Sequence, residues 1–77
     1  MELHEFIEKF AEQFDETPTE EFKANTEFKA IEEWSSLSVL TIIAMVDEEF
    51  GVTIKAEEIR RVDTIKELYD FIVSKVN

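Results

Sequence analysis

Two adjacent serines, Ser35 and Ser36, are the residues of this sequence best suited to carry chemistry. They precede an apolar stretch that we expect to be helical, so they stand where the first N–H groups of a helix lack backbone partners. One interpretation is a helix cap, in which a serine hydroxyl accepts a hydrogen bond from one of these N–H groups and stabilises the helix by about 1 kcal/mol. The other is a modified serine, because the same helix end favours a phosphate group. The two interpretations are compatible, since Ser35 can cap the helix while Ser36 carries the phosphate.

The other residues that could serve in catalysis or metal binding are too few, or are wrongly spaced, to form a site. His4 has no second histidine or cysteine with which to form a nucleophile–base pair or a zinc site. A calcium loop that began at Asp47 would need glycine at its sixth position, and Gly51 is at the fifth. Adjacent carboxylates such as Glu32 and Glu33 point apart on a helix. We therefore expect no metal site, no catalytic residues and no enzymatic activity in the chain itself.

The helix that must position Ser36 is predicted to run from Ser36 to Phe50 and to end in a left-handed cap at Gly51. Its apolar stripe is expected to face the core and consists of Val39, Ile42, Ile43, Val46 and Phe50. Leu37, Leu40 and Ala44 lie off this stripe. They either form an exposed apolar strip beside Ser36 that meets partner proteins, or pack beneath the preceding loop.

Three more helices are predicted, which makes the chain an all-α four-helix bundle. The first carries the apolar stripe Leu3, Phe6, Ile7, Phe10 and Phe14. The third is short, runs from Ala56 to Arg61 and contributes Ile59 to the core. The fourth opens at a capping box, has Lys75 near its C-terminal end, and carries the stripe Ile65, Leu68, Tyr69, Ile72 and Val76. Val52–Ile54 alternates like a strand but has no partner strand, so we expect an extended loop.

A long loop of about twenty residues precedes Ser36, where bundles usually use roughly 2–8. We expect it to be ordered, because burial of an apolar side chain contributes roughly 1.5–3 kcal/mol. Its anchoring side chains are predicted to be Phe22, Phe28, Ile31 and Trp34. The segment Thr17–Glu20 predicts a capping box and a single helical turn.

Composition limits the size of the protein and the nature of its partners. With 77 residues, one Gly, one Pro and no Cys, the chain suits a single domain over residues 1–77, without disulfides. A net charge of −11 argues against nucleic acid and favours partner proteins with basic patches. No apolar run reaches the roughly 18 residues of a membrane span, and Met1–Glu5 lacks the basic region of a signal peptide. We expect a cytoplasmic monomer that does not insert into membranes.

Several stretches resemble acyl carrier proteins, in which the serine of an Asp-Ser-Leu motif opens the second helix. They are Ser35–Leu37, the acidic helix end and following apolar residues of Val46–Ile54, and the loop approach Phe28–Trp34. The resemblance implies that a phosphopantetheinyl transferase moves 4′-phosphopantetheine from coenzyme A to Ser36. It also implies that the thiol of this cofactor carries acyl, aminoacyl or polyketide groups as thioesters. Fatty acid synthesis, polyketide or peptide assembly, specialised lipid biosynthesis and aminoacyl loading for a specialised pathway all stay open.

Three positions depart from the pattern of that family. Ser35 and Ser38 stand where the family has aspartates, and Thr41 stands where many members have glutamate. The resemblance implies that the aspartates help the transferase to dock or to hold its magnesium ion. We therefore expect a non-housekeeping carrier, for which a dedicated transferase is one explanation.

The acidic residues of the predicted second helix gather at its end: Asp47, Glu48 and Glu49. We hypothesise that they contact basic docking patches on acyl-transferring or condensing enzymes, with Leu37, Leu40 and Ala44 also meeting the partner. A merely solvated acidic face is the rival interpretation of the cluster. The rival function is an unmodified acidic helical adaptor, in which Ser36 only caps the helix and the apolar strip binds a partner protein.

Overall fold

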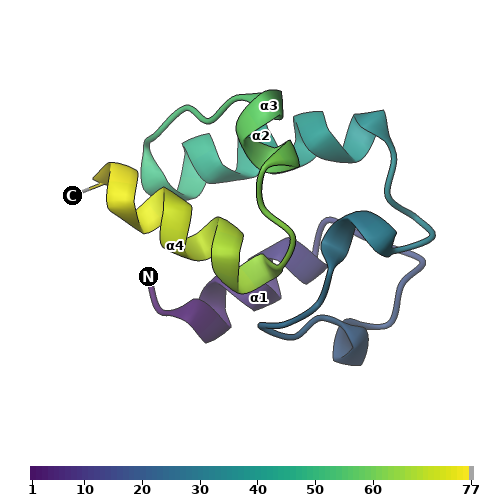
Figure 1. Ribbon diagram of the computed structural model, residues 1–77. Helices are drawn as coiled ribbons and strands as arrows, with labels where there is room; N and C mark the ends of the chain where they lie inside the picture. The colour runs from purple at the N-terminus through teal and green to yellow at the C-terminus, as the bar shows by residue number, and fades with distance from the viewer. Residues whose placement is uncertain (77) are drawn as a thin grey trace.

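A computed structural model of the chain describes residues 1–76, in which four α-helices pack around one core (Figure 1). The helices are α1 (Leu3–Ala11), α2 (Ser36–Phe50), α3 (Ala56–Arg60) and α4 (Ile65–Val76). Residues 1–76 contain no strand beyond an isolated bridge between Glu27 and Thr64. The predicted all-α bundle with a short third helix is confirmed, and Val52–Ile54 lies in a loop, as expected.

Local sequence signals set the ends of these helices. α4 begins at the predicted capping box, where Thr64 Oγ1 accepts the N–H of Glu67 at 3.1 Å and Glu67 Oε1 accepts the N–H of Thr64 at 3.0 Å. α2 ends at Gly51, whose φ of 71° lies in the left-handed region that suits glycine. α1 is shorter than its stripe predicts: it ends at Ala11, before Phe14, although the Phe14 side chain is still buried.

The core consists largely of the predicted stripes. Its fully buried side chains include Phe6, Phe10, Phe28, Ile42, Val46, Ile54, Ile59, Ile65, Leu68 and Ile72. Met45 is also buried, although the predicted stripe of α2 omitted it, because α1 packs along that flank of α2. The prediction that Val76 faces the core is wrong: it is 52% exposed, one turn beyond Ile72, the last buried residue of α4.

The long loop, residues 12–35, packs against the core as predicted. Phe22 and Phe28 are buried, while Ile31 and Trp34 pack against the core from its margin. Their burial holds the loop in place, so the segment that leads into α2 is ordered.

One part of the loop differs from the prediction. A 3₁₀ turn forms at Thr19–Glu21, as expected, but Pro18 precedes the turn rather than opening it. The predicted capping box is absent from this turn, because its N-cap residue is Pro18, whose side chain has no acceptor; the Thr17 hydroxyl donates to Glu33 Oε1 at 2.7 Å. Thr17 therefore ties the two ends of the loop together.

Figure 1 shows how these elements are arranged around α2. The long loop reaches α2 at the right of the view, whereas both termini lie at the left. α3 packs against α2, and α1 contacts both α2 and α4. Among the described residues, no helix is long and apolar enough to cross a membrane. The start of α2 thus lies at the side of the molecule away from the termini.

Candidate functional site

Trp34 fixes the approach of the loop to α2. Its indole stacks on the ring of Phe10, with centroids 6.5 Å apart and planes 3° from parallel, and meets the ring of Phe28 edge-on at 5.1 Å. The N–H of Trp34 also donates to the carbonyl of Ile31 at 2.9 Å. Because this anchor lies directly before Ser35, the backbone enters α2 in a defined direction. The predicted anchoring role of Trp34 is confirmed.

Ser35 is the N-cap residue of α2, as predicted. Its backbone is extended, with φ −148° and ψ 179°, and its carbonyl accepts the N–H of Ser38 at 3.0 Å. Ser38 Oγ in turn accepts the N–H of Ser35 at 3.0 Å, which is the returning hydrogen bond of a capping box. The sequence analysis missed this role of Ser38. The sequence signal that could have revealed this role is the spacing of Ser38, which lies three residues after the capping serine.

Ser36 is the first residue of α2 and is exposed. Within the described residues, the N–H groups of Ser36 and Leu37 have no hydrogen-bond partner, as expected at a helix start. The first turn of α2 has no acidic residue, whereas the first turns of α1 and α4 contain Glu5 and Glu67. The positive end of this helix dipole therefore has no carboxylate in its own turn, and it would attract a phosphate ester on Ser36.

The Ser36 hydroxyl lies on an open surface rather than in a cleft. A groove of about 790 Å³ lies within the long loop, with Glu16, Glu27 and Glu33 among its lining residues. A second groove of about 450 Å³ lies between α1 and α2. Ser36 lines neither groove, so a modifying enzyme can reach its hydroxyl directly. Within residues 1–76, no cluster of three histidine, aspartate or glutamate side chains could hold a metal ion.

An uncharged apolar strip runs along α2 from its start. Leu37 and Leu40 are 73% and 63% exposed, and Ala44 is exposed as well. The alternative that these residues pack beneath the loop is therefore wrong. The Thr41 hydroxyl donates to the carbonyl of Leu37 at 3.0 Å, so its polar atom is engaged within the helix. The sequence from Ser36 to Val46 contains no charged residue, so this face offers apolar contact without a competing charge.

The last turns of α2 are acidic, in contrast to the uncharged strip at its start. The three carboxylates predicted to meet a partner are all exposed there: Asp47, Glu48 and Glu49. The last turn of α2 contains no basic residue to offset them. Carboxylates at a helix C-terminus oppose the helix dipole, so they lower the stability of the helix. Local helix stability therefore does not account for this cluster.

Comparison with known protein families gives one match. The family described as phosphopantetheine attachment site matches residues 4–72, a range that contains all of α2 and α3 and most of α1 and α4. Searches of curated proteins and of solved structures found no match to this chain. The matched range therefore includes the capped helix start and the exposed serine that the structure places there.

Proposed function

The chain belongs to the phosphopantetheine attachment-site family, and from that premise we propose that Ser36 is the serine to which the 4′-phosphopantetheine arm is attached. Domains of this family carry a covalent cofactor arm and do not catalyse reactions themselves. The chain is therefore a phosphopantetheine carrier rather than an enzyme. Membership in this family also favours the carrier over the unmodified adaptor.

The observation that carries the assignment to Ser36 is the division of roles among the serines at the start of α2. Ser38 Oγ accepts the N–H of Ser35 at 3.0 Å in the cap of α2, while the exposed Ser36 hydroxyl takes no part in it. A phosphodiester on Ser36 would lie at the helix N-terminus, where free N–H groups and the helix dipole stabilise negative charge. These features support Ser36 over Ser35 as the attachment point.

The chain's own residues would hold the arm and present it. When attached, the arm supplies a terminal thiol that takes up acyl groups as thioesters. Trp34 and the cap fix the position of Ser36, and the open surface around Ser36 leaves the arm free to reach partner enzymes. No base from this chain is required at Ser36, because the phosphopantetheinyl transferase activates the hydroxyl during attachment.

We further propose that the cargo is an acyl group and that the carrier serves a specialised pathway in the cytoplasm. Support for the specialised pathway comes from the helix start, where Ser35 and Ser38 replace the aspartates that the resemblance to acyl carrier proteins leads one to expect. A transferase or a partner enzyme that relies on those charges would find none there. The whole chain, residues 1–77, would act as one monomeric domain.

The proposed docking surface for partner enzymes is the exposed face of α2. Leu37, Leu40 and Ala44 would enter apolar contacts beside Ser36. Asp47, Glu48 and Glu49 would pair with basic residues of acyl-transferring or condensing enzymes. The cost of these three carboxylates at a helix C-terminus supports a role outside the fold itself.

The attachment site is tested by intact-protein mass spectrometry after incubation with coenzyme A, magnesium and a broad-specificity phosphopantetheinyl transferase. We expect the wild type and Ser35→Ala to gain one phosphopantetheine and Ser36→Ala to gain none. Ser35→Ala is the matched control, because it removes the neighbouring hydroxyl at a cost of about 1 kcal/mol in helix stability. A gain in Ser36→Ala, located by peptide mapping at another residue, would overturn the assignment.

Mass spectrometry of the protein purified from its native host distinguishes a dedicated transferase from the absence of modification. If the broad-specificity enzyme fails but the native protein carries the arm on Ser36, the attachment site stands and the transferase is specialised. If the native protein carries no arm either, the proposal is wrong and the adaptor function takes its place.

A further inference from the structure

α3 is too short to be stable without contacts to the rest of the protein. It has five residues, whereas isolated helices shorter than about 12–15 residues are marginal in water. Ile59 is its one buried side chain, and the helix packs against α2. A loop precedes it at Val52–Ile54, and a turn follows it at Arg61. The position of α3 therefore depends on Ile59 and on contacts made by other elements.

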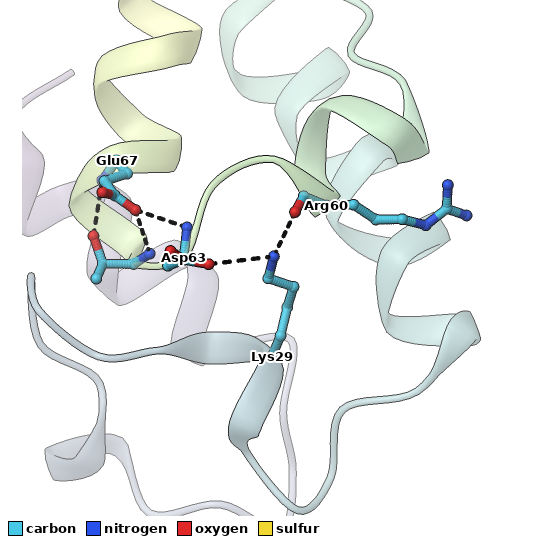
Figure 2. Close-up of polar contacts among 5 residues, drawn as sticks. Lys29, Arg60, Asp63 and Glu67 are labelled. Carbon is cyan, nitrogen blue, oxygen red and sulfur yellow. Dashed lines mark hydrogen bonds and ion pairs between the residues drawn. The ribbon is translucent and has the colours of Figure 1, made fainter.

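The first of these contacts comes from Lys29 in the long loop (Figure 2). Its ammonium group donates to the backbone carbonyl of Arg60, the last residue of α3, at 2.8 Å. The same Nζ lies 3.8 Å from Asp63 Oδ1. It also lies 5.9 Å from the centroid of the Phe28 ring. Because Phe28 is fully buried, Lys29 is attached to the core at its base and holds the C-terminal end of α3 with its tip.

The second contact is made at Glu58, in the middle of α3. Glu58 Oε2 lies 3.2 Å from Lys75 Nζ, which belongs to the last turn of α4. Glu58 Oε1 accepts the backbone N–H of Lys55 at 2.8 Å. Lys75 is itself positioned 5.3 Å from the centroid of the Phe71 ring. One lysine from the loop therefore holds the C-terminal end of this short helix, and one from α4 holds its middle.

The segment that follows α3 is held in a different way. The N–H of Ile65 donates to the carbonyl of Thr26 at 3.2 Å, and the N–H of Lys66 donates to the carbonyl of Ala24 at 2.9 Å. Glu67 caps α4 through the N–H groups of Asp63 and Thr64, as Figure 2 shows. These backbone contacts join the loop to α4 without either lysine. Loss of a lysine contact would therefore loosen α3 and leave the start of α4 in place.

We propose that residues 55–62, which we name the α3 flap, form a separately opening unit that Lys29 and Lys75 hold closed. Opening withdraws Ile59 from the core and uncovers the side of α2 on which α3 packs, while α1, α2 and α4 stay folded. It thereby changes the surface that the chain presents along α2. This inference does not depend on the modification of Ser36.

The test is amide hydrogen exchange of the unmodified full chain, read residue by residue in the wild type, Lys29→Met and Lys75→Met. Methionine keeps much of the aliphatic stem but cannot donate a hydrogen bond or form an ion pair. We expect exchange of the α3 flap amides to rise roughly tenfold in Lys29→Met, which loses a charged hydrogen bond. In Lys75→Met, which loses a partly exposed ion pair, the expected rise is roughly threefold. Amides of α1 and α2 should keep their wild-type rates.

Lys66→Met is the matched control, because it removes the same charge from an exposed ion pair with Asp70, 2.8 Å long, that does not touch α3. Its α3 flap amides should exchange as in the wild type. Equal acceleration in all helices of Lys29→Met would show global destabilisation and overturn the proposal. The same flap acceleration in Lys66→Met would also overturn it, because net charge rather than the two lysine contacts would then be responsible.

Discussion

Ser38 accepts the N–H of Ser35 on its hydroxyl at 3.0 Å, and so the cap of α2 is built without a charge. The resemblance to acyl carrier proteins leads one to expect aspartate at both positions. Aspartate is an equally good capping residue and adds a favourable interaction with the helix dipole. The serine pair therefore preserves the start of the helix and removes two carboxylates from the neighbourhood of Ser36.

Restoring those carboxylates should speed the modification of Ser36. In Ser35→Asp/Ser38→Asp, we expect faster attachment of phosphopantetheine by a broad-specificity transferase, because the transferase regains the charges that its docking or its magnesium ion uses. Helix stability should also rise by roughly 0.3–1 kcal/mol per aspartate. A time course by intact-protein mass spectrometry measures the rate, and thermal denaturation measures the stability.

The control for this prediction is Ser35→Asn/Ser38→Asn, which offers capping oxygens without charge. It should be modified at the wild-type rate. If the aspartate and asparagine variants are modified equally fast, charge at these positions does not matter to the transferase and the prediction is wrong.

The parts of the site that the sequence predicted are those governed by local signals. The bounds of α2 at Ser36 and Phe50 follow from a capping serine, an apolar stripe and Gly51, each of which acts within one or two helical turns. The anchoring of the loop by Phe28 and Trp34 follows from the large apolar surface of each side chain. These features need no knowledge of how the helices pack.

The parts that the sequence did not predict depend on packing between distant segments. Met45 is buried only because α1 lies along its flank. The exposure of Leu37 depends on the path of the long loop, which does not cover this residue. The contact of Lys29 with the carbonyl of Arg60 joins residues 31 positions apart and involves a backbone atom, which leaves no sequence signature. Such contacts become visible only in the folded chain.

The acidic end of α2 should stabilise partner complexes at the expense of the free protein. Neutralising it with Asp47→Asn/Glu48→Gln/Glu49→Gln should raise the melting temperature. Each carboxylate at a helix C-terminus lowers helix stability by about 0.3–1 kcal/mol at low ionic strength. The same variant should bind a basic partner enzyme more weakly and associate with it more slowly. Calorimetry of the free protein and stopped-flow binding to a transferase measure the two effects.

A loop variant with the same change in charge is the control: Asp15→Asn/Glu20→Gln/Glu32→Gln. All three of its positions are exposed. It should leave partner affinity close to that of the wild type. Equal loss of affinity in both variants would mean that partners respond to net charge rather than to the end of α2.

Net charge should limit the stability of the whole protein. A charge of −11 on 77 residues produces self-repulsion, which salt screens as the Debye length falls from about 30 Å at 0.01 M to about 10 Å at 0.1 M. We expect the melting temperature to rise over this range, and to rise further with magnesium. Differential scanning calorimetry measures the shift. An unchanged melting temperature would show that charge repulsion is not limiting, without bearing on the carrier function.

The pH dependence of stability should identify Glu67 as a stabilising carboxylate. The N–H groups of Asp63 and Thr64, with a smaller contribution from Lys29, hold the pKa of Glu67 below its ordinary value. A group whose pKa is lower in the folded state stabilises it above the unfolded pKa, about 4.3 for glutamate. This stabilisation is lost as the pH falls through the folded pKa. Glu67→Gln should therefore melt below the wild type near pH 7, and the difference should shrink below about pH 4.

Glu32→Gln is the control for this measurement, because it removes an exposed carboxylate from the loop and relieves repulsion. It should melt at or above the wild-type temperature near pH 7, opposite in sign to Glu67→Gln. Thermal melts of the three proteins between pH 3 and pH 7, at one ionic strength, provide the comparison. If Glu67→Gln is as stable as the wild type at pH 7, or if its deficit persists unchanged at pH 3, the ionised carboxylate of Glu67 does not stabilise the start of α4.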